Sequence, residues 1–145
     1  MNLIEKLLKD NNDYENASHL VDVEGLSTAR VCNLLNDLVA NLKEGEYYLE
    51  IGTWKGLTLS SAIYKNKGKK AVACDKFRFW GKWTGWGFIA KRNLLNNIKK
   101  YGKDGADVKF HHMTSQELFN KKLVPQNVKV YFYDGDHSYE GTKHG

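Results

Sequence analysis

The chain has 145 residues, enough for one domain of ordinary size, and its 41% apolar and 27% charged residues are typical of a globular protein. This composition excludes a disordered or fibrous protein, and the single proline excludes a proline-rich linker. No uncharged apolar run approaches the roughly 18 residues of a membrane-spanning helix, and the charged start MNLIEKLLKD does not fit a secretion signal. We therefore expect a soluble, cytoplasmic protein that carries Cys32 and Cys74 as reduced thiols.

The net charge of +5 is distributed unevenly along the chain. Residues 1–75 carry 9 basic and 11 acidic side chains, whereas residues 76–145 carry 13 and 6. A basic half can attract nucleic acid or an anionic small molecule, or it can be a solvated lysine surface. Because the lysines are scattered singly or in pairs, nucleic-acid binding is kept only as an alternative.

Segments with helical periodicity alternate with short apolar runs that predict strands. Two helices are expected first, one at 3–8 and one that begins after an N-cap at Ser27 and ends near Leu42. The remaining elements, in chain order, are a strand at 47–51, a helix at 57–64, a strand at 71–74, a helix at 88–101, a strand at 108–112, a short helix at 116–120 and a strand at 128–133. This alternation predicts an α/β fold with a parallel sheet that is covered by helices on both faces.

Ligands of parallel sheets bind beyond the carboxyl ends of the strands. The residues that follow the first predicted strand are therefore candidates for a binding site. The first strand ends in the sequence EIGTWKG, residues 50–56, and Thr58 opens the next helix. Gly52 permits a sharp turn, Gly56 lets the helix approach the strand, and the free N–H groups of the helix can bind an anion. Taken alone, this turn is equally well explained by a purely structural role.

The second predicted strand ends at Asp75, nineteen residues after Gly56. This offset is close to the roughly 20 residues at which an acidic side chain meets the ribose hydroxyls of a bound nucleoside. The alternative is that Asp75 only caps the loop that follows it. The combination of the glycine turn and the aspartate favours a nucleoside-binding site.

The run from Tyr47 to Gly56, followed by Asp75, resembles the cofactor-binding half of class I S-adenosylmethionine-dependent methyltransferases. The resemblance implies a Rossmann-like three-layer sandwich with the strand order 3-2-1-4. It also implies that the turn binds the methionine part of S-adenosylmethionine, that Thr58 binds its carboxylate and that Asp75 binds its ribose. Ser115 and Gln116 resemble the pair with which catechol-type O-methyltransferases hold the adenine. The complete set of cofactor-binding residues implied in this way is Glu50, Gly52, Thr53, Trp54, Gly56, Thr58, Asp75, Ser115, Gln116 and Asp134.

The fourth predicted strand is followed by the sequence DGDHSYEG, residues 134–141. Two carboxylates and an imidazole so close together would repel and desolvate one another, which is unfavourable unless they have a catalytic role or bind a cation. The plain alternative is that Asp134 caps a helix while Asp136 and His137 are solvated. The string resembles a methyltransferase branch that includes sugar O-methyltransferases and cephalosporin hydroxylase-like proteins. In that branch the aspartate ligates a divalent metal and the histidine is the general base, which implies Asp134 as metal ligand and Asp134 and His137 as catalytic residues here.

These features together predict metal-assisted O-methylation of a hydroxylated small molecule such as a sugar. A cation such as Mg²⁺ would lower the pKa of the acceptor hydroxyl, and His137 would take its proton. One alternative is a module that binds S-adenosylmethionine or S-adenosylhomocysteine without turnover, and another is a basic nucleic-acid-binding domain. The tryptophan-rich segment 78–88 could be a lid, a substrate wall, a partner surface or an ordinary hydrophobic loop.

Only four of the seven strands of a class I methyltransferase are predicted, because strands 5 to 7 are missing. We therefore expect a single, partial methyltransferase domain over residues 1–145, with N-terminal helices in about 1–44 and a βαβ core in about 45–145. The fourth strand would be an edge with unpaired N–H and C=O groups. This predicts a homodimer that covers the fourth strand, unless the chain is a fragment of a longer protein.

Overall fold

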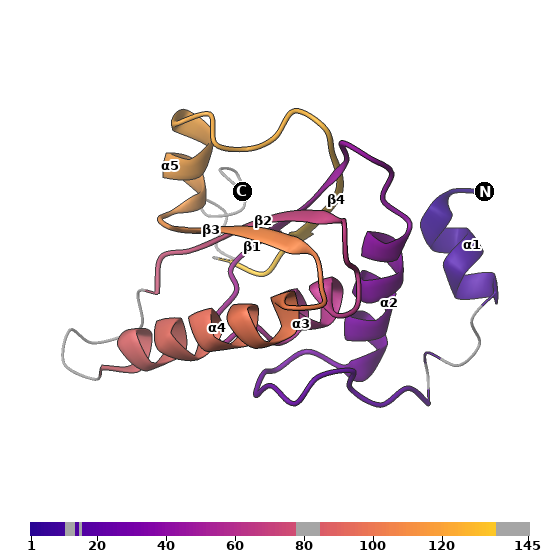
Figure 1. The fold of residues 1–145 in the computed structure, drawn as a ribbon, viewed down its shortest axis with the longest axis horizontal. Helices are drawn as coiled ribbons and strands as arrows, with labels where there is room; N and C mark the ends of the chain where they lie inside the picture. The colour runs from indigo at the N-terminus through magenta and orange to yellow at the C-terminus, as the bar shows by residue number, and fades with distance from the viewer. Residues whose placement is uncertain (11–13, 15, 78–84, 136–145) are drawn as a thin grey trace.

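The computed structural model describes residues 1–10, 14, 16–77 and 85–135. Its centre is a four-stranded parallel sheet with the order β3-β2-β1-β4 (Figure 1). The strands are β1 (Tyr47–Ile51), β2 (Lys70–Asp75), β3 (Asp107–His112) and β4 (Val128–Tyr133). The α/β fold and the strand order 3-2-1-4 are therefore confirmed.

The helices are α1 (Leu3–Asp10), α2 (Ala29–Ala40), α3 (Leu57–Ile63), α4 (Trp86–Gly102) and α5 (Ser115–Asn120). The sequence predicted each of them, with ends displaced by a few residues. The expected N-cap of α2 at Ser27 is wrong, because the hydroxyl of Thr28 accepts the N–H of Val31 and caps the helix one residue later.

The sheet separates two apolar cores because successive side chains on a strand point to opposite faces. Tyr48 and Ala73 face the layer formed by α2, α3 and α4, where Leu94 is fully buried. Leu49 and Val72 face the other side, where they cluster with Leu118 of α5. The result is three layers, with α2 to α4 on one face of the sheet and α5 on the other (Figure 1).

The strand β4 pairs with β1 and lies at the edge of the sheet that the structure describes. Tyr131 in this strand is 46% exposed, which agrees with an uncovered edge. The homodimer that would cover this edge stays a prediction. Every helix in the described ranges is too short or too polar to cross a membrane.

Two glycines allow close approaches around the end of β1. Gly52 has a φ of +84°, and a Cβ at this position would lie 2.6 Å from the carbonyl carbon of Asp134 and 2.7 Å from the amide nitrogen of Gly135. Gly52 therefore lets the segments that follow β1 and β4 touch. Gly56 has a φ of +91°, and its Cβ would lie 2.6 Å from Cδ1 of Leu94. The helix that starts after Gly56 thus approaches α4, rather than the strand as expected.

The two effects of a side chain at Gly52, backbone strain and collision, can be separated experimentally. Gly52→Ala should destabilise the protein more than Gly68→Ala, because Gly68 has the same φ of +84° but a Cβ there would meet no atom within 4 Å. Strain at a positive φ costs on the order of 1 kcal/mol in both variants, and only Gly52→Ala adds a collision with backbone. Chemical denaturation measures both free energies of unfolding. Equal losses would show that the contact between Gly52 and Asp134 is not tight.

Candidate functional site

The turn between β1 and α3, residues 52–56, is held by the carboxylate of Asp75 at the end of β2. Oδ2 of Asp75 accepts the backbone N–H groups of Thr53 at 2.8 Å and Trp54 at 2.7 Å. Oδ1 accepts the N–H of Phe77 at 2.7 Å. Trp54 has a φ of +45°, which is uncommon for a residue with a side chain, and its bond to Asp75 stabilises this conformation. One carboxylate thus fixes the geometry of two strand ends.

Asp75 keeps acceptor capacity after making these bonds. A carboxylate oxygen has two lone pairs, and within the described ranges Oδ1 accepts only the N–H of Phe77. A ligand hydroxyl could therefore still donate to Oδ1. The predicted ribose contact at Asp75 remains compatible with the structure, although nothing in the residue spacing indicated that the same carboxylate also holds the turn.

Glu50 is completely buried beneath this turn, on the face of the sheet that packs against α2 and α3. Its two carboxyl oxygens accept hydrogen bonds from the hydroxyl of Tyr48 at 2.5 Å and from that of Thr58 at 2.6 Å. The sequence predicted that Glu50 and Thr58 contact the cofactor, whereas the structure shows their side chains bonded to each other below the surface. Their contact with a cofactor stays a prediction, and the observed role is to support the turn from inside.

Burial raises the pKa of Glu50 from its ordinary value of 4.5 to about 8, even though the hydrogen bonds from Thr58 and Tyr48 act in the opposite direction. The negative charges of Asp134 and Asp75 contribute to the increase. Glu50 is therefore mostly neutral near pH 7. The same interactions show that three carboxyl groups, from the ends of β1, β2 and β4, lie close enough to affect one another.

The segment after β4 lies directly against the turn. The N–H of Asp134 donates to the carbonyl oxygen of Ile51 at 2.8 Å, and the Asp134 side chain is exposed. Asp136 and His137 lie outside the described residues, so the predicted general base has no described position. Among the residues that the structure does describe, no group of three His, Cys, Asp or Glu side chains is placed to hold a metal ion.

The residues of the predicted adenine site follow β3, next to Asp75, at the carboxyl ends of the strands. Asp75 pairs with His112 in the register of β2 and β3, and α5 begins shortly after that strand. Thr114 caps α5 in a reciprocal capping box with Glu117, which leaves Ser115 half-buried and Gln116 exposed in the first turn. Their side chains are therefore accessible to a ligand, and their contact with an adenine stays a prediction.

The four predicted strand ends are brought together at one edge of the sheet. Because all strands are parallel and their order is β3-β2-β1-β4, the lateral sequence of site residues is Ser115, Asp75, Gly52 and Asp134. Direct contacts join Gly52 to Asp134 and the turn to Asp75. Of the aromatic segment 78–88, residues 78–84 lie outside the described part, so its role as a lid or wall also stays a prediction.

The buried carboxyl of Glu50 should make stability depend on pH. Between about pH 4.5 and pH 8, the folded protein holds a proton on Glu50 that the unfolded chain has lost, so the free energy of unfolding should fall as the pH rises through this range. The contribution of one such group approaches about 1.4 kcal/mol per pH unit. Glu50→Gln, which mimics the neutral acid, should remove this slope.

Urea denaturation between pH 5 and pH 8 measures the slope for the wild-type protein and the variant. The exposed Glu44→Gln is the matched control and should behave like the wild-type protein. If Glu50→Gln and the wild-type protein lose stability equally across this range, Glu50 is ionised in the folded state and the interpretation is wrong.

Comparisons with known proteins find a family model, a similar viral protein and similar solved structures, one of which is described here. An uncharacterized protein, R132, of Acanthamoeba polyphaga mimivirus is 27% identical over 101 residues, which are 68% of this chain and 42% of the viral protein. The crystal structure of an O-methyltransferase from Bacillus cereus in complex with SAH is 18% identical, with a TM-score of 0.47, and the match covers 92% of this chain and 54% of that one. This chain therefore spans only about half of the length of either relative. Residues 49–144, more than half of the chain, match the family model described as a methyltransferase domain, and the protein belongs to this family.

Proposed function

We propose that the protein is an S-adenosylmethionine-dependent methyltransferase whose cofactor binds at the carboxyl edge of the sheet. The observation that carries the proposal is the turn 52–56, which Asp75 holds on one side and the segment after β4 contacts on the other. Membership in the methyltransferase domain family supports it, because the matched residues 49–144 include the turn, Asp75 and the segment after β4.

The charge of the strand ends suits this cofactor. S-adenosylmethionine supplies a methyl group on a positively charged sulfur, and a cation is favoured near carboxylates. Burial is the main cause of the raised pKa of Glu50, and the negative charges of Asp134 and Asp75, on either side of the turn, contribute to it. Because Glu50 is mostly neutral near pH 7, these two aspartates are the groups that would act on a cationic ligand.

The individual contacts are assigned as the sequence predicted them. Gly52, Thr53, Trp54 and Gly56 would lie along the methionine part, Asp75 would accept a ribose hydroxyl through Oδ1, and Ser115 and Gln116 would bond to the adenine. Glu50 and Thr58 would support the turn, with Thr58 also the predicted contact of the cofactor carboxylate. The absence of a side chain at Gly52 would leave the backbone open to a close approach by the ligand.

For the transfer step, we propose a hydroxylated small molecule such as a sugar as the acceptor. His137 would accept the proton of the acceptor hydroxyl while the oxygen attacks the methyl carbon, and Asp134 would bind a hard cation such as Mg²⁺. Among the described residues, no group of three His, Cys, Asp or Glu side chains is placed to hold a metal ion, so the further ligands of the proposed cation are not assigned. Two observations support the proposal that a cation binds here: Asp134 is exposed beside the turn, and it opens the motif DGDHSYEG.

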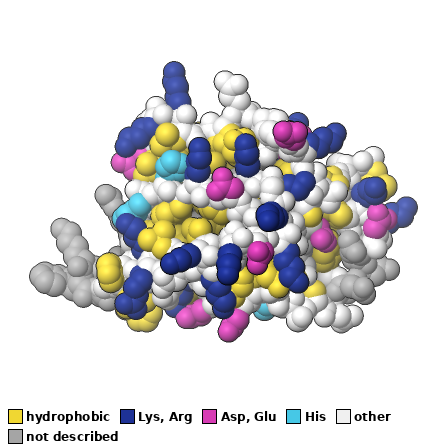
Figure 2. Space-filling model, viewed as in Figure 1, with side chains coloured by type: hydrophobic (Ala, Val, Ile, Leu, Met, Phe, Trp, Pro, Cys, Tyr) yellow, Lys and Arg dark blue, Asp and Glu magenta, His cyan; other side chains and the backbone are white. Residues whose placement is uncertain are grey.

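Nucleic-acid binding, the other sequence-based alternative, gains no support from the face of the molecule that Figure 2 shows. In Figure 2 the lysine and arginine side chains are spread over the visible face and mixed with acidic and hydrophobic ones, without forming one basic stripe.

Calorimetry with S-adenosylhomocysteine tests the cofactor site. We expect the wild-type protein to bind S-adenosylhomocysteine and Asp75→Asn to bind it roughly tenfold more weakly. The asparagine side chain has only one oxygen that accepts hydrogen bonds, so it cannot hold the turn and accept a ligand hydroxyl as the carboxylate does. Asp107→Asn, an exposed change at the opposite end of β3, is the control and should bind normally. No binding by the wild-type protein, or unchanged binding by Asp75→Asn, would contradict the proposed site.

A methyl-transfer assay with hydroxylated acceptors, run with Mg²⁺ or with EDTA, tests the chemistry. We expect turnover that EDTA suppresses, and a loss of on the order of 100-fold in His137→Ala, which is typical when a general base is removed. Cofactor binding should persist in this variant. Turnover that is insensitive to EDTA would eliminate the metal, whereas binding without any turnover would favour the module that only binds the cofactor.

A further inference from the structure

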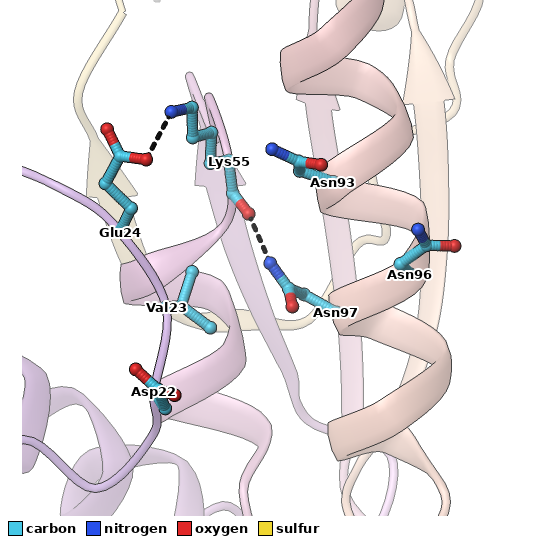
Figure 3. A pocket seen from close by; sticks show the side chains of 7 residues that line it. All are labelled: Asp22, Val23, Glu24, Lys55, Asn93, Asn96 and Asn97. Carbon is cyan, nitrogen blue, oxygen red and sulfur yellow. Dashed lines mark hydrogen bonds and ion pairs between the residues drawn. The ribbon is translucent and has the colours of Figure 1, made fainter.

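The turn 52–56 borders a cavity on the side of the helices. The cavity has a volume of about 290 Å³ and lies between the segment 22–24, Lys55 of the turn and α4 (Figure 3). Its lining residues, which are polar or charged except for one valine, are Asp22, Val23, Glu24, Lys55, Asn93, Asn96 and Asn97. Because apolar side chains do not fill this space, the turn depends here on polar links to the two other walls.

Lys55 makes both of these links. Its side chain is 9% exposed, and Nζ forms an ion pair with Glu24 at 2.5 Å. Its carbonyl oxygen accepts a hydrogen bond from Nδ2 of Asn97 at 2.9 Å, which ties the turn to α4. Figure 3 shows the two links leaving Lys55 toward opposite walls of the cavity. Since a buried ammonium group is unfavourable without a partner, the carboxylate of Glu24 is what makes this position of Lys55 favourable.

Glu24 is held in place by its neighbours, although its own side chain is 73% exposed. The N–H of Asp22 donates to the hydroxyl of Tyr101 in α4 at 3.0 Å. Gly25 lies so close to the start of α3 that a Cβ at this position would be 2.5 Å from the Cβ of Leu57. The residues on both sides of Glu24 are therefore fixed, one to α4 and the other to α3.

The ammonium group of Lys55 also contacts Trp54, which belongs to the proposed cofactor site. Nζ lies 4.7 Å from the centre of the Trp54 ring, a distance typical of a cation–π contact. Trp54 is the residue that has a φ of +45° and donates its N–H to Asp75. A displacement of the Lys55 side chain would therefore act directly on this residue.

The other carboxylate of the lining is not placed to replace Glu24. Figure 3 shows Asp22 at the far end of the segment 22–24, away from Nζ of Lys55. The position of the ammonium group thus depends on Glu24 in particular.

We propose that Glu24 is a positioning residue for the cofactor site. Its carboxylate holds the ammonium group of Lys55, 31 positions further along the chain, and thereby keeps the turn 52–56 in the conformation that binds S-adenosylmethionine. Glu24 acts through Lys55 and does not touch the cofactor. The proposal rests on the proposed function, because the turn is the proposed contact of the methionine part.

The unequal burial of the two partners predicts an unequal response to substitution. In Glu24→Gln the buried ammonium group loses its partner and moves toward water, so binding of S-adenosylhomocysteine should weaken roughly tenfold. In Lys55→Met/Glu24→Gln no buried charge is left, so the affinity should return to within about threefold of the wild-type value. Glu24→Asp keeps the charge on a shorter side chain and should have an intermediate affinity.

Calorimetry with S-adenosylhomocysteine on the full chain measures these affinities, and a ¹H–¹⁵N spectrum shows that each variant is folded. The exposed Glu44→Gln is the matched control and should bind like the wild-type protein. In the ligand-free proteins, the amide signals of Thr53 and Trp54 should shift in Glu24→Gln but not in Glu44→Gln. A role of Glu24 in stability alone would lower the free energy of unfolding without changing the affinity of the folded protein.

The outcomes separate this proposal from the proposed function. If the wild-type protein does not bind S-adenosylhomocysteine, the proposed function is wrong and the positioning role is overturned with it. If the wild-type protein binds and Glu24→Gln binds equally well, only the positioning role is overturned. The same holds if the folded double variant binds no better than Glu24→Gln.

Discussion

The bond between the carboxylate of Asp75 and the backbone N–H groups of Thr53 and Trp54 is the interaction on which the site depends. The turn after β1 leaves the sheet at a glycine with a positive φ and passes through Trp54, which also has a positive φ. Such a backbone conformation is unfavourable for a residue with a side chain and persists only where surrounding contacts hold it. Asp75 supplies them from the neighbouring strand, and the contact of Gly52 with Asp134 closes the other side.

The same arrangement explains why Glu50 is buried as a mostly neutral acid. A charge at this position would lie in the apolar layer between the sheet and α3 and near two other carboxylates. Tyr48 and Thr58 satisfy its oxygens, so the group costs little as long as it keeps its proton. The proposed cationic ligand would lie near Asp75 and Asp134, whose negative charges also act on Glu50.

Periodicity and strand-end residues made most of the fold predictable. Alternation of apolar runs identified all four strands, and the glycine turn with Asp75 located the carboxyl edge of the sheet. Alternation along β1 puts Tyr48 and Glu50 on the same face, but both faces of this strand are buried, so the pattern could not show which face packs against α2 and α3. The hydrogen bonds of Asp75 and the choice of Thr28 over Ser27 as N-cap depend on side-chain geometry that spacing does not encode. The cavity between the segment 22–24, Lys55 and α4 escaped prediction because its walls come from segments far apart in the sequence, which only the packing of α4 against the turn brings together.

The central claim is that the turn and its neighbours at the carboxyl edge of the sheet form one ligand site. Mapping of backbone amide shifts in a ¹H–¹⁵N spectrum during titration with S-adenosylhomocysteine tests it most directly. We predict that the amide signals of Thr53, Trp54 and Ser115 move together with one apparent Kd, while those at the opposite edge, such as Lys70 and Val128, do not. Shifts that are absent from the carboxyl edge, or that follow different dissociation constants there, would contradict the account.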